Sequence, residues 1–276
     1  MNTPWKILHF SDWHGKLPKI PKTHRNAETV IVLSGDICDN YPHETFIPGI
    51  KTGPIFTPSI AKNSLGEPRY HRGLPVYDWR PGTYNYRRIN TVREAELQNE
   101  WIENQLIPHL KQNGIDPDNV IAINGNHDWA DFEKYFKHAL RQGSKTIVFR
   151  GVKIGLLTGV PSIVGEWHDE ITEWSFEDRC NALDRDIEIL ITHAAPKGIR
   201  DGGYGSNYLY KATIGLSFQE PYFRNLQYHL FGHSHGKFGV DKQEIEVEGK
   251  ATRIVRFCNA AENRFAIDFT PAPVIE

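Results

Sequence analysis

Five short stretches of the sequence place aspartate, asparagine or histidine directly after an apolar run. They are residues 11–15 (SDWHG), 35–39 (GDICD), 124–128 (NGNHD), His193, and 232–236 (GHSHG). Carboxylate, amide and imidazole groups are ligands of divalent transition metals. Because ligands bind beyond the carboxyl ends of strands in an open α/β sheet, the five stretches are predicted to meet at one rim.

The apolar runs themselves are too short for helices and are rich in leucine or β-branched residues, which favours buried parallel strands. Those that lead into the polar stretches are residues 5–10, 29–34, 120–123, 187–192 and 228–231. Further strands are predicted at residues 153–158, 253–257 and 265–269.

Three helices are predicted. Residues 91–113 begin with Thr91 and Glu94 in capping-box spacing and end before Gly114, with Pro108 expected to kink the helix. Residues 131–142 show helical spacing of Phe132, Phe136, Ala139 and Leu140, and residues 175–184 form a weaker amphipathic pattern.

Taken singly, each polar stretch has an ordinary explanation. Asp12 and His14 could form a common polar junction between strand and loop, and Gly35-Asp36 is turn chemistry. All five stretches occur in order, however, and each follows an apolar run, which favours one shared metal site.

The series D-x-H, G-D-x-x-D, G-N-H-D, H and G-H-x-H resembles that of the calcineurin-like metallophosphoesterase superfamily, and it extends from residue 12 to residue 235. The resemblance implies a four-layer α/β/β/α sandwich with mixed sheets, and residues 1–276 as a single domain of this type. The ends THAAPKG and HLFGHSHGKFGV resemble the branch of small metallophosphoesterase-domain proteins. The protein Ser/Thr phosphatases carry arginine at the place of Asn40, which argues against that branch.

The resemblance also implies two divalent metal ions that share one carboxylate. The first metal is expected to be held by Asp12, His14, Asp36 and His235. The second is expected to be held by Asp36, Asn126, His193 and His233. Mixed imidazole and oxygen ligands suit Mn, Fe, Zn, Co or Ni better than Mg or Ca.

The reaction that such a site implies is attack on phosphorus by a hydroxide that bridges the two metals. His127 lies beside a ligand without being needed as one, so it is expected to protonate the leaving oxygen, with Asp128 orienting its ring. Asp39 is expected either to contribute to catalysis or to form a local cap.

Other histidines are predicted to be ordinary. His9 lies within a strand and is expected to be a core residue, whereas His168 follows an apolar stretch and could reach the site. The three cysteines form neither a disulfide framework nor a sulfur-ligated zinc site, and they are expected to be buried thiols.

Composition excludes several classes of protein. The formal net charge of −2 gives no overall basic field for non-specific nucleic-acid binding. No apolar run approaches the roughly 18 residues of a membrane helix, and the first residues (MNTPWKILHF) show no signal-peptide pattern. The protein is therefore expected to be cytoplasmic and reduced, without a membrane partner.

Residues 41–90 fit neither helical nor strand periodicity. They contain eight aromatic residues and seven Lys or Arg against three Asp or Glu, a local charge of +4. This insertion is expected to form a cap over the metals, where it could stack a base and meet a phosphate. The alternative is a structural excursion or a dimer arm. Residues 198–223, with Tyr204, Tyr208 and Tyr210, are a second candidate wall.

The function predicted from the sequence is a binuclear metal-dependent phosphodiesterase acting on nucleotide-like or other small phosphodiesters. Phosphomonoesterase or nuclease activity of the same superfamily is the alternative within enzymes. A catalytically weak metal-binding scaffold, a partner-binding module or a metal sensor is the alternative of another class. The sequence leaves the substrate, the native metals and the oligomeric state open.

Overall fold

The structure is a computed structural model that describes residues 5–41, 55–60, 70–71, 74–75, 77–82, 90–162, 167–216, 219–245 and 252–270. Its contacts divide the chain into two compact units. One unit comprises Met1–Asn40 and Val92–Glu276, and the other comprises Tyr41–Thr91. The larger unit contains all five polar stretches.

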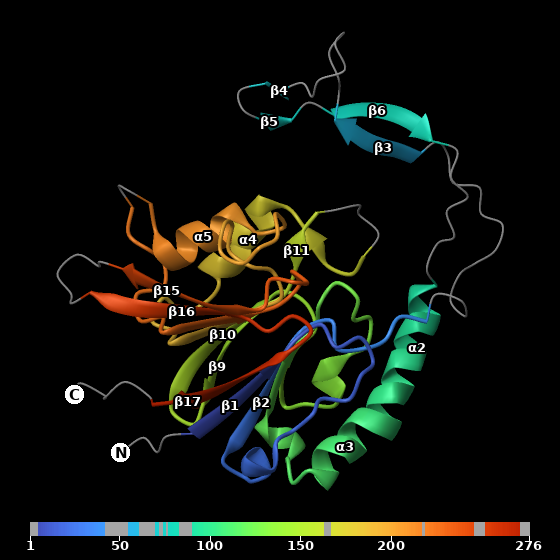
Figure 1. The fold of residues 1–276 in the computed structure, drawn as a ribbon, viewed down its shortest axis with the longest axis vertical. Helices are drawn as coiled ribbons and strands as arrows, with labels where there is room; N and C mark the ends of the chain where they lie inside the picture. Colours follow the sequence, from blue (N-terminus) through green and yellow to red (C-terminus); the bar gives the residue numbers. More distant parts are fainter. Residues whose placement is uncertain are drawn as a thin grey trace. The chain divides into compact units, whose positions relative to one another are not determined.

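The larger unit contains two mixed β-sheets (Figure 1). The first has the order β17-β1-β2-β7-β8 and is parallel except for the edge strand β17. Its strands are β1 (Trp5–Phe10), β2 (Thr29–Ser34), β7 (Val120–Ile123), β8 (His138–Leu140) and β17 (Arg264–Phe269).

The second sheet has the order β15-β16-β14-β13-β10-β9, with four parallel strands between two antiparallel edge strands. The parallel strands are β10 (Val152–Leu157), β13 (Ile189–Thr192), β14 (Tyr228–Phe231) and β16 (Arg253–Asn259). The edge strands are β9 (Ser144–Phe149) and β15 (Gly239–Ile245). A short parallel pair, β11 (Val160–Pro161) and β12 (Glu170–Ile171), lies outside both sheets.

Successive side chains of each strand point to opposite faces, and here both faces are buried. In β1, Trp5 and Ile7 belong to a core shared with strands of the second sheet, whereas Leu8 and Phe10 belong to a core shared with helices. Burial on both faces explains why these strands are nearly continuous apolar runs, as the sequence predicted.

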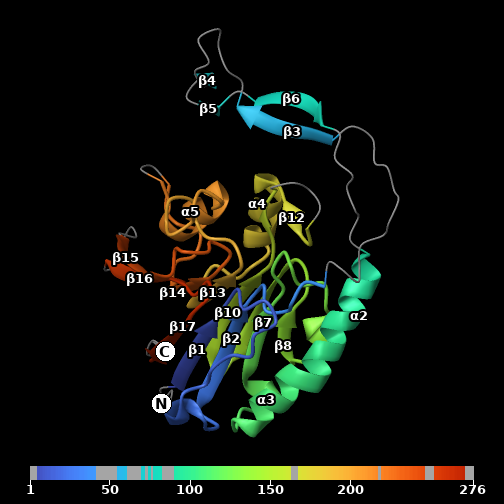
Figure 2. The same cartoon turned by 45° about the vertical axis from the view of Figure 1, so that its right-hand side comes forward.

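Helices cover the outer face of each sheet (Figure 2). On the first sheet, α2 (Thr91–Trp101), a π-helical turn (Ile102–Leu106) and α3 (Ile107–Gln112) follow one another directly. The π turn precedes Pro108, which has no N–H to donate to the turn before it. On the second sheet lie α4 (Glu173–Asn181) and α5 (Asn207–Ile214). The predicted four-layer α/β/β/α sandwich is confirmed.

The predicted helix at residues 131–142 is wrong. This segment forms a 3₁₀ turn (Phe132–Lys134) and then strand β8, which pairs with β7. A helix would place Phe136, Ala139 and Leu140 on one face, but Ala139 packs in the core under α2 and α3, whereas Leu140 packs in the core between the sheets. The segment therefore forms the edge strand of the first sheet.

The smaller unit contains two antiparallel pairs of strands. β3 (Ile55–Ile60) pairs with β6 (Tyr77–Gly82), and β4 (Tyr70–His71) pairs with β5 (Leu74–Pro75). Most of residues 41–90 lie outside the described residues, so the cap stays a prediction. In the described part of the chain, no helix has the length and apolar character needed to cross a bilayer.

Candidate metal centre

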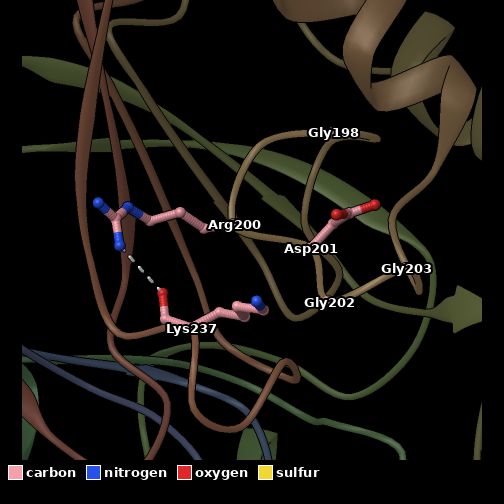
Figure 3. Close-up of a pocket in the computed structure, with 6 residues that line it drawn as sticks. All are labelled: Gly198, Arg200, Asp201, Gly202, Gly203 and Lys237. Carbon is pink, nitrogen blue, oxygen red and sulfur yellow. Dashed lines mark hydrogen bonds between the residues drawn. The ribbon is translucent and has the colours of Figure 1, made fainter.

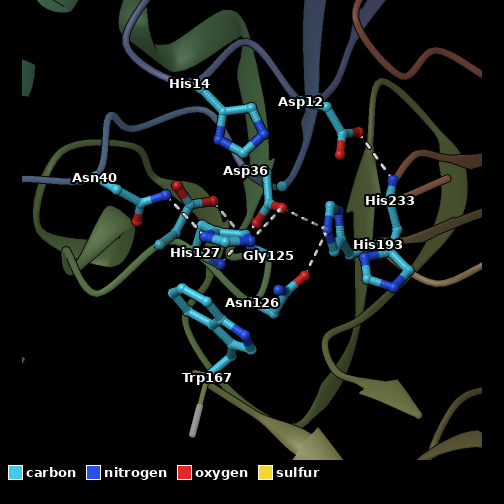
Figure 4. A network of polar contacts seen from close by, with 12 residues as sticks. Asp12, His14, Asp36, Asn40, Gly125, Asn126, His127, Trp167, His193 and His233 are labelled. Atoms are coloured by element: carbon cyan, nitrogen blue, oxygen red, sulfur yellow. Dashed lines mark hydrogen bonds and ion pairs between the residues drawn. The ribbon is translucent and has the colours of Figure 1, made fainter. Parts of the chain in front are cut away.

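The five polar stretches meet at the carboxyl ends of β1, β2, β7, β13 and β14 (Figure 4). Their side chains form two groups, in each of which one ligand atom per residue lies within 4.8 Å of the others. The groups are Asp12 with His14 and His235, and Asp36 with His193 and His233. Both sheets therefore contribute to one centre.

In the first group, His235 Nε2 lies 3.1 Å from Asp12 Oδ1 and 3.4 Å from His14 Nε2. The other oxygen of Asp12 accepts a hydrogen bond from the backbone N–H of His233 at 2.9 Å. The second ring nitrogen of His235, Nδ1, lies 3.4 Å from a Glu262 carboxylate oxygen. A carboxylate behind a ligating imidazole fixes its tautomer and orientation.

In the second group, His193 is fully buried, and its Nε2 lies 3.2 Å from Asp36 Oδ2 and 3.1 Å from Asn126 Oδ1. Its Nδ1 lies 2.8 Å from the carbonyl oxygen of Ser34, to which it donates. This hydrogen bond leaves Nε2 as the nitrogen available to a cation. Asn126, an amide that the sequence predicted as a ligand, thus lies beside the carboxylate and imidazole of this group.

One unpaired atom indicates that the site fits a cation. His233 Nε2 is buried and has no hydrogen-bond partner among the described residues. Buried polar atoms without a partner are rare and costly in proteins. A divalent cation held with Asp36 and His193 would satisfy this nitrogen, and the mixed imidazole and oxygen set suits transition metals.

Asp36 and His193 shift each other's pKa. Burial by itself raises the pKa of Asp36, but the charge and hydrogen bond of His193 outweigh burial and bring it well below its ordinary value. Burial by itself lowers the pKa of His193, but the Asp36 carboxylate raises it to about 9. Because a ligating imidazole must be neutral, metal uptake is expected to release this proton.

Two glycines of the polar stretches permit this close packing. A Cβ at Gly125 would overlap Asp36 Oδ1, and a Cβ at Gly232 would overlap Asp12 Oδ2. Close-packed protein interiors do not tolerate such overlaps. Only glycine therefore lets the ends of β7 and β14 lie against the two carboxylates.

His127 lies beside the second group without belonging to it. Its backbone N–H donates to Asp36 Oδ1 at 2.8 Å, and its Nε2 lies 4.0 Å from Asp36 Oδ2. Its Nδ1 lies 2.8 Å from the side-chain nitrogen of Asn40, and its ring centroid lies 4.2 Å from that of Trp167. Burial lowers the pKa of His127. His127 is thus a neutral imidazole whose Nδ1 contacts Asn40 and whose Nε2 faces Asp36.

The hydrogen bonds of Asp128 go to backbone amides, and its expected role in orienting the His127 ring stays a prediction. Asp128 is fully buried, and its carboxylate accepts backbone N–H groups of Ile37, Cys38 and Gly125 at 2.9–3.1 Å. A carboxylate that accepts several amides in this way ties two loops together. The side chain of Asn40 lies beside the ring.

Asp39 is exposed, and its carboxylate accepts the N–H of Asn40 at 2.9 Å. This is the local-cap position that was one of the two expectations for it. A role of Asp39 in catalysis stays a prediction.

Several residues around the centre were not predicted from the sequence. Gln98 of α2 is buried, and its amide nitrogen donates to the carbonyl oxygens of Asp39 and His127, so it joins the loops after β2 and β7. Asn40, Trp167 and Glu262 were also missed. Of these residues, only Asn40 could have been found from the sequence, because it directly follows the second polar stretch.

Two of the remaining histidines have packing roles. His168 does not contact the ligands with its ring, which packs against Trp129 with centroids 5.4 Å apart, although its backbone N–H donates to the Asn126 carbonyl. His9 is fully buried and pairs with Ser34 Oγ at 2.8 Å, as a core histidine should. All three cysteines are free and buried, as predicted.

No protein-family model and no curated protein matches the chain. Among solved structures, it is similar to a 5'-nucleotidase precursor from Thermus thermophilus, with 10% identity and a TM-score of 0.39. The similarity covers 93% of this chain and 48% of that chain, so this chain spans about half the length of that protein. A likeness of this extent supports no statement about activity.

Proposed function

We propose that this protein is a metal-dependent phosphoesterase with two divalent cations, and that small phosphodiesters, including nucleotide-like ones, are its substrates. The observation that carries the proposal is the pair of ligand groups at one rim, Asp12 with His14 and His235, and Asp36 with His193 and His233. Two adjacent cation sites suit a reaction in which charge develops on several oxygens at once.

Two cations bound there would supply Lewis acidity to the phosphoryl oxygens and an activated water. The residues of the chain would hold them: Asp12, His14 and His235 at one position, His193, His233 and Asn126 at the other, and Asp36 at both. The contacts of Ser34 with His193 and of Glu262 with His235 orient the two imidazoles.

His127 is proposed to protonate the leaving oxygen. When the amide nitrogen of Asn40 donates to Nδ1, the imidazole proton lies on Nε2, the atom that faces Asp36. A neutral imidazole with its proton on that side can donate it to a developing alkoxide. Trp167, packed on the same ring, restricts the direction in which the imidazole points.

The test is hydrolysis of bis-p-nitrophenyl phosphate after removal of metals and reloading with Mn, Fe, Zn, Co or Ni. We expect turnover only in reloaded protein, and its loss in the variant Asp36→Asn. Asparagine keeps the shape of the side chain and an oxygen that can accept the His127 N–H, so the variant is expected to fold.

Two results would oppose the proposal: turnover that survives chelation, or full activity of Asp36→Asn. Metal binding without turnover on any ester would favour the scaffold or sensor. A substrate screen with p-nitrophenyl phosphate, cyclic nucleotides and single-stranded nucleic acid would separate diesterase from monoesterase and nuclease.

A further inference from the structure

A pocket lies between the loop of residues 198–203 and Lys237, which follows the ligand His235 in the sequence. Its volume is about 300 Å³, and its lining is Gly198, Arg200, Asp201, Gly202, Gly203 and Lys237 (Figure 3). This volume is at the small end of small-molecule sites. The proposed hydrolysis uses none of these residues.

Residues that line the pocket contact the loop that carries two of the ligands. Lys237 lies two residues after His235, and Ser234, between the ligands His233 and His235, donates to the Asp201 carbonyl oxygen at 2.6 Å. Tyr204 follows the glycine pair and packs edge-on against His233, with ring centroids 6.0 Å apart. The loop that lines this pocket therefore packs against the loop that carries the ligands His233 and His235.

Most charges of the pocket are already paired. Arg200 donates to Asp241 and to the carbonyl oxygens of Lys237 and Phe238, and Figure 3 shows its guanidinium turned away from the glycines. The Asp201 carboxylate lies 3.7 Å from Lys197 Nζ and accepts the Gly205 N–H. Backbone amides and Lys197 bring the pKa of Asp201 below its ordinary value although burial opposes this shift.

Lys237 is the exception. Its side chain is exposed, and among the described residues no carboxylate forms an ion pair with it. Its stem lies against the glycine loop, because a Cβ at Gly202 would be 3.7 Å from Lys237 Cγ. Figure 3 shows its ammonium directed along that loop. Gly203, which also lines the pocket, has no neighbour within 4 Å of a Cβ position, so the pocket is open at this glycine.

We propose that this pocket binds a second anionic group of the substrate, such as a further phosphate, with Lys237 as the residue that recognises it. The inference rests on the proposed phosphoesterase function and names a substrate class for it: phosphodiesters that carry another phosphate. An ammonium is a strong phosphate partner, and a glycine loop lets the ligand approach closely.

The experiment compares two diesters that differ by one phosphate: the p-nitrophenyl ester of thymidine 5'-phosphate, and the same ester with a 3'-phosphate. The quantity measured is the ratio of kcat/KM for the second ester to that for the first. We expect Lys237→Ala to lower this ratio about tenfold, and the loss to shrink at high salt. Lys237→Arg should restore most of it.

The matched control is Lys111→Ala, an exposed lysine of α3 on the other sheet, which should leave the ratio unchanged. A second readout needs no catalysis: binding of inorganic phosphate to metal-free protein, followed by ³¹P nuclear magnetic resonance. It should weaken in Lys237→Ala and not in Lys111→Ala.

The outcomes separate the two proposals. An unchanged ratio together with unchanged phosphate binding in Lys237→Ala would overturn the pocket assignment while ester hydrolysis continued. No hydrolysis of either ester by the wild-type protein would instead oppose the phosphoesterase function, and the phosphate titration would then decide the pocket alone.

Discussion

At the scale of single residues, the ligands themselves adopt an unfavourable backbone conformation. Four of the predicted ligands have positive φ angles, from 44° to 66°: Asp12, His14, Asp36 and His233. For residues other than glycine this left-handed region costs about 1 kcal/mol or more. Each lies where the chain leaves a strand and must turn its side chain toward the centre, so we infer that stability is given up to orient ligands.

This inference predicts an order of stability for variants of His14, which has a φ of 44° and is only half-buried. Both His14→Ala and His14→Gly remove the imidazole, but only glycine relieves the backbone. In metal-free protein we expect His14→Gly to be more stable than His14→Ala by about 1 kcal/mol, measured by urea denaturation. Equal stabilities would show that this backbone is not strained.

Addition of metal provides the complementary measurement. Both His14 variants should lose much of the stabilisation that metal gives the wild-type protein, because each lacks the same ligand. A variant that kept the full effect would exclude His14 as a ligand.

His127 leads to a different prediction, since it lies beside the ligands but is held by Asn40 and Trp167. His127→Ala should retain its metals and lose turnover by about 10²- to 10⁴-fold, the usual contribution of a proton donor. The loss should be larger for an alkyl leaving group than for p-nitrophenolate, which needs no proton. Metal content measured by mass spectrometry is the control, and equal losses for both leaving groups would contradict the assignment.

At the scale of elements, a buried ion pair fixes the segment that carries Trp167. Arg179 of α4 donates to both oxygens of Asp169 and to the carbonyl oxygen of Thr158, and Gln142 and Thr158 also donate to Asp169. Burial raises the pKa of Asp169, but the hydrogen bond and charge of Arg179 bring it below its ordinary value. The network thereby joins α4 to the loop beside the metal centre.

A lowered carboxyl pKa has a definite sign for stability. The ionised carboxylate adds its full amount to the free energy of unfolding above the unfolded pKa of about 3.9. This stabilisation is lost as the pH falls through the pKa of the folded state. Asp169→Asn should therefore destabilise the protein at pH 7 by about 3 kcal/mol and lose less stability than wild type when acidified from pH 5. Thermal denaturation across this range measures both effects.

The exposed pair of Lys153 and Asp186 serves as the control. Asp186→Asn should change stability at pH 7 by about 0.5 kcal/mol or less, since exposed ion pairs contribute little. If the two variants responded equally to acid, the buried pair would not be the source of the pH dependence.

Elements also show where sequence reasoning succeeds. Strands such as β2 were predicted with correct bounds because both faces are buried, so the whole run is apolar. The segment before β9 was predicted wrongly because the spacing of Phe132 and Phe136 is helical, whereas residues 138–140 pair with the open edge of the preceding strand, β7. Trp167 and Glu262 were missed because pairings across the fold, not local patterns, bring them to His127 and His235.

At the scale of the whole molecule, charge is divided between the two units. The chain carries −2 overall, while residues 41–90 carry +4, so the remainder carries −6. The three hydrophobic cores found among the residues that the structure describes all lie in the larger unit. The larger unit is thus expected to fold around these cores, and the positive charge of residues 41–90 is expected to matter for anionic ligands.

This division predicts the result of replacing residues 42–89 by a glycine–serine linker. The variant should keep the unfolding transition of the larger unit and its metal binding, because the three cores found among the described residues lie in the larger unit. If the segment is a cap, KM for a nucleotide diester should rise several-fold more than KM for bis-p-nitrophenyl phosphate, which offers no base to stack. High salt should reduce the difference, since a +4 segment attracts anions less when screened. Equal changes for both substrates, with a shift from dimer to monomer in sedimentation, would instead identify the segment as a dimer arm.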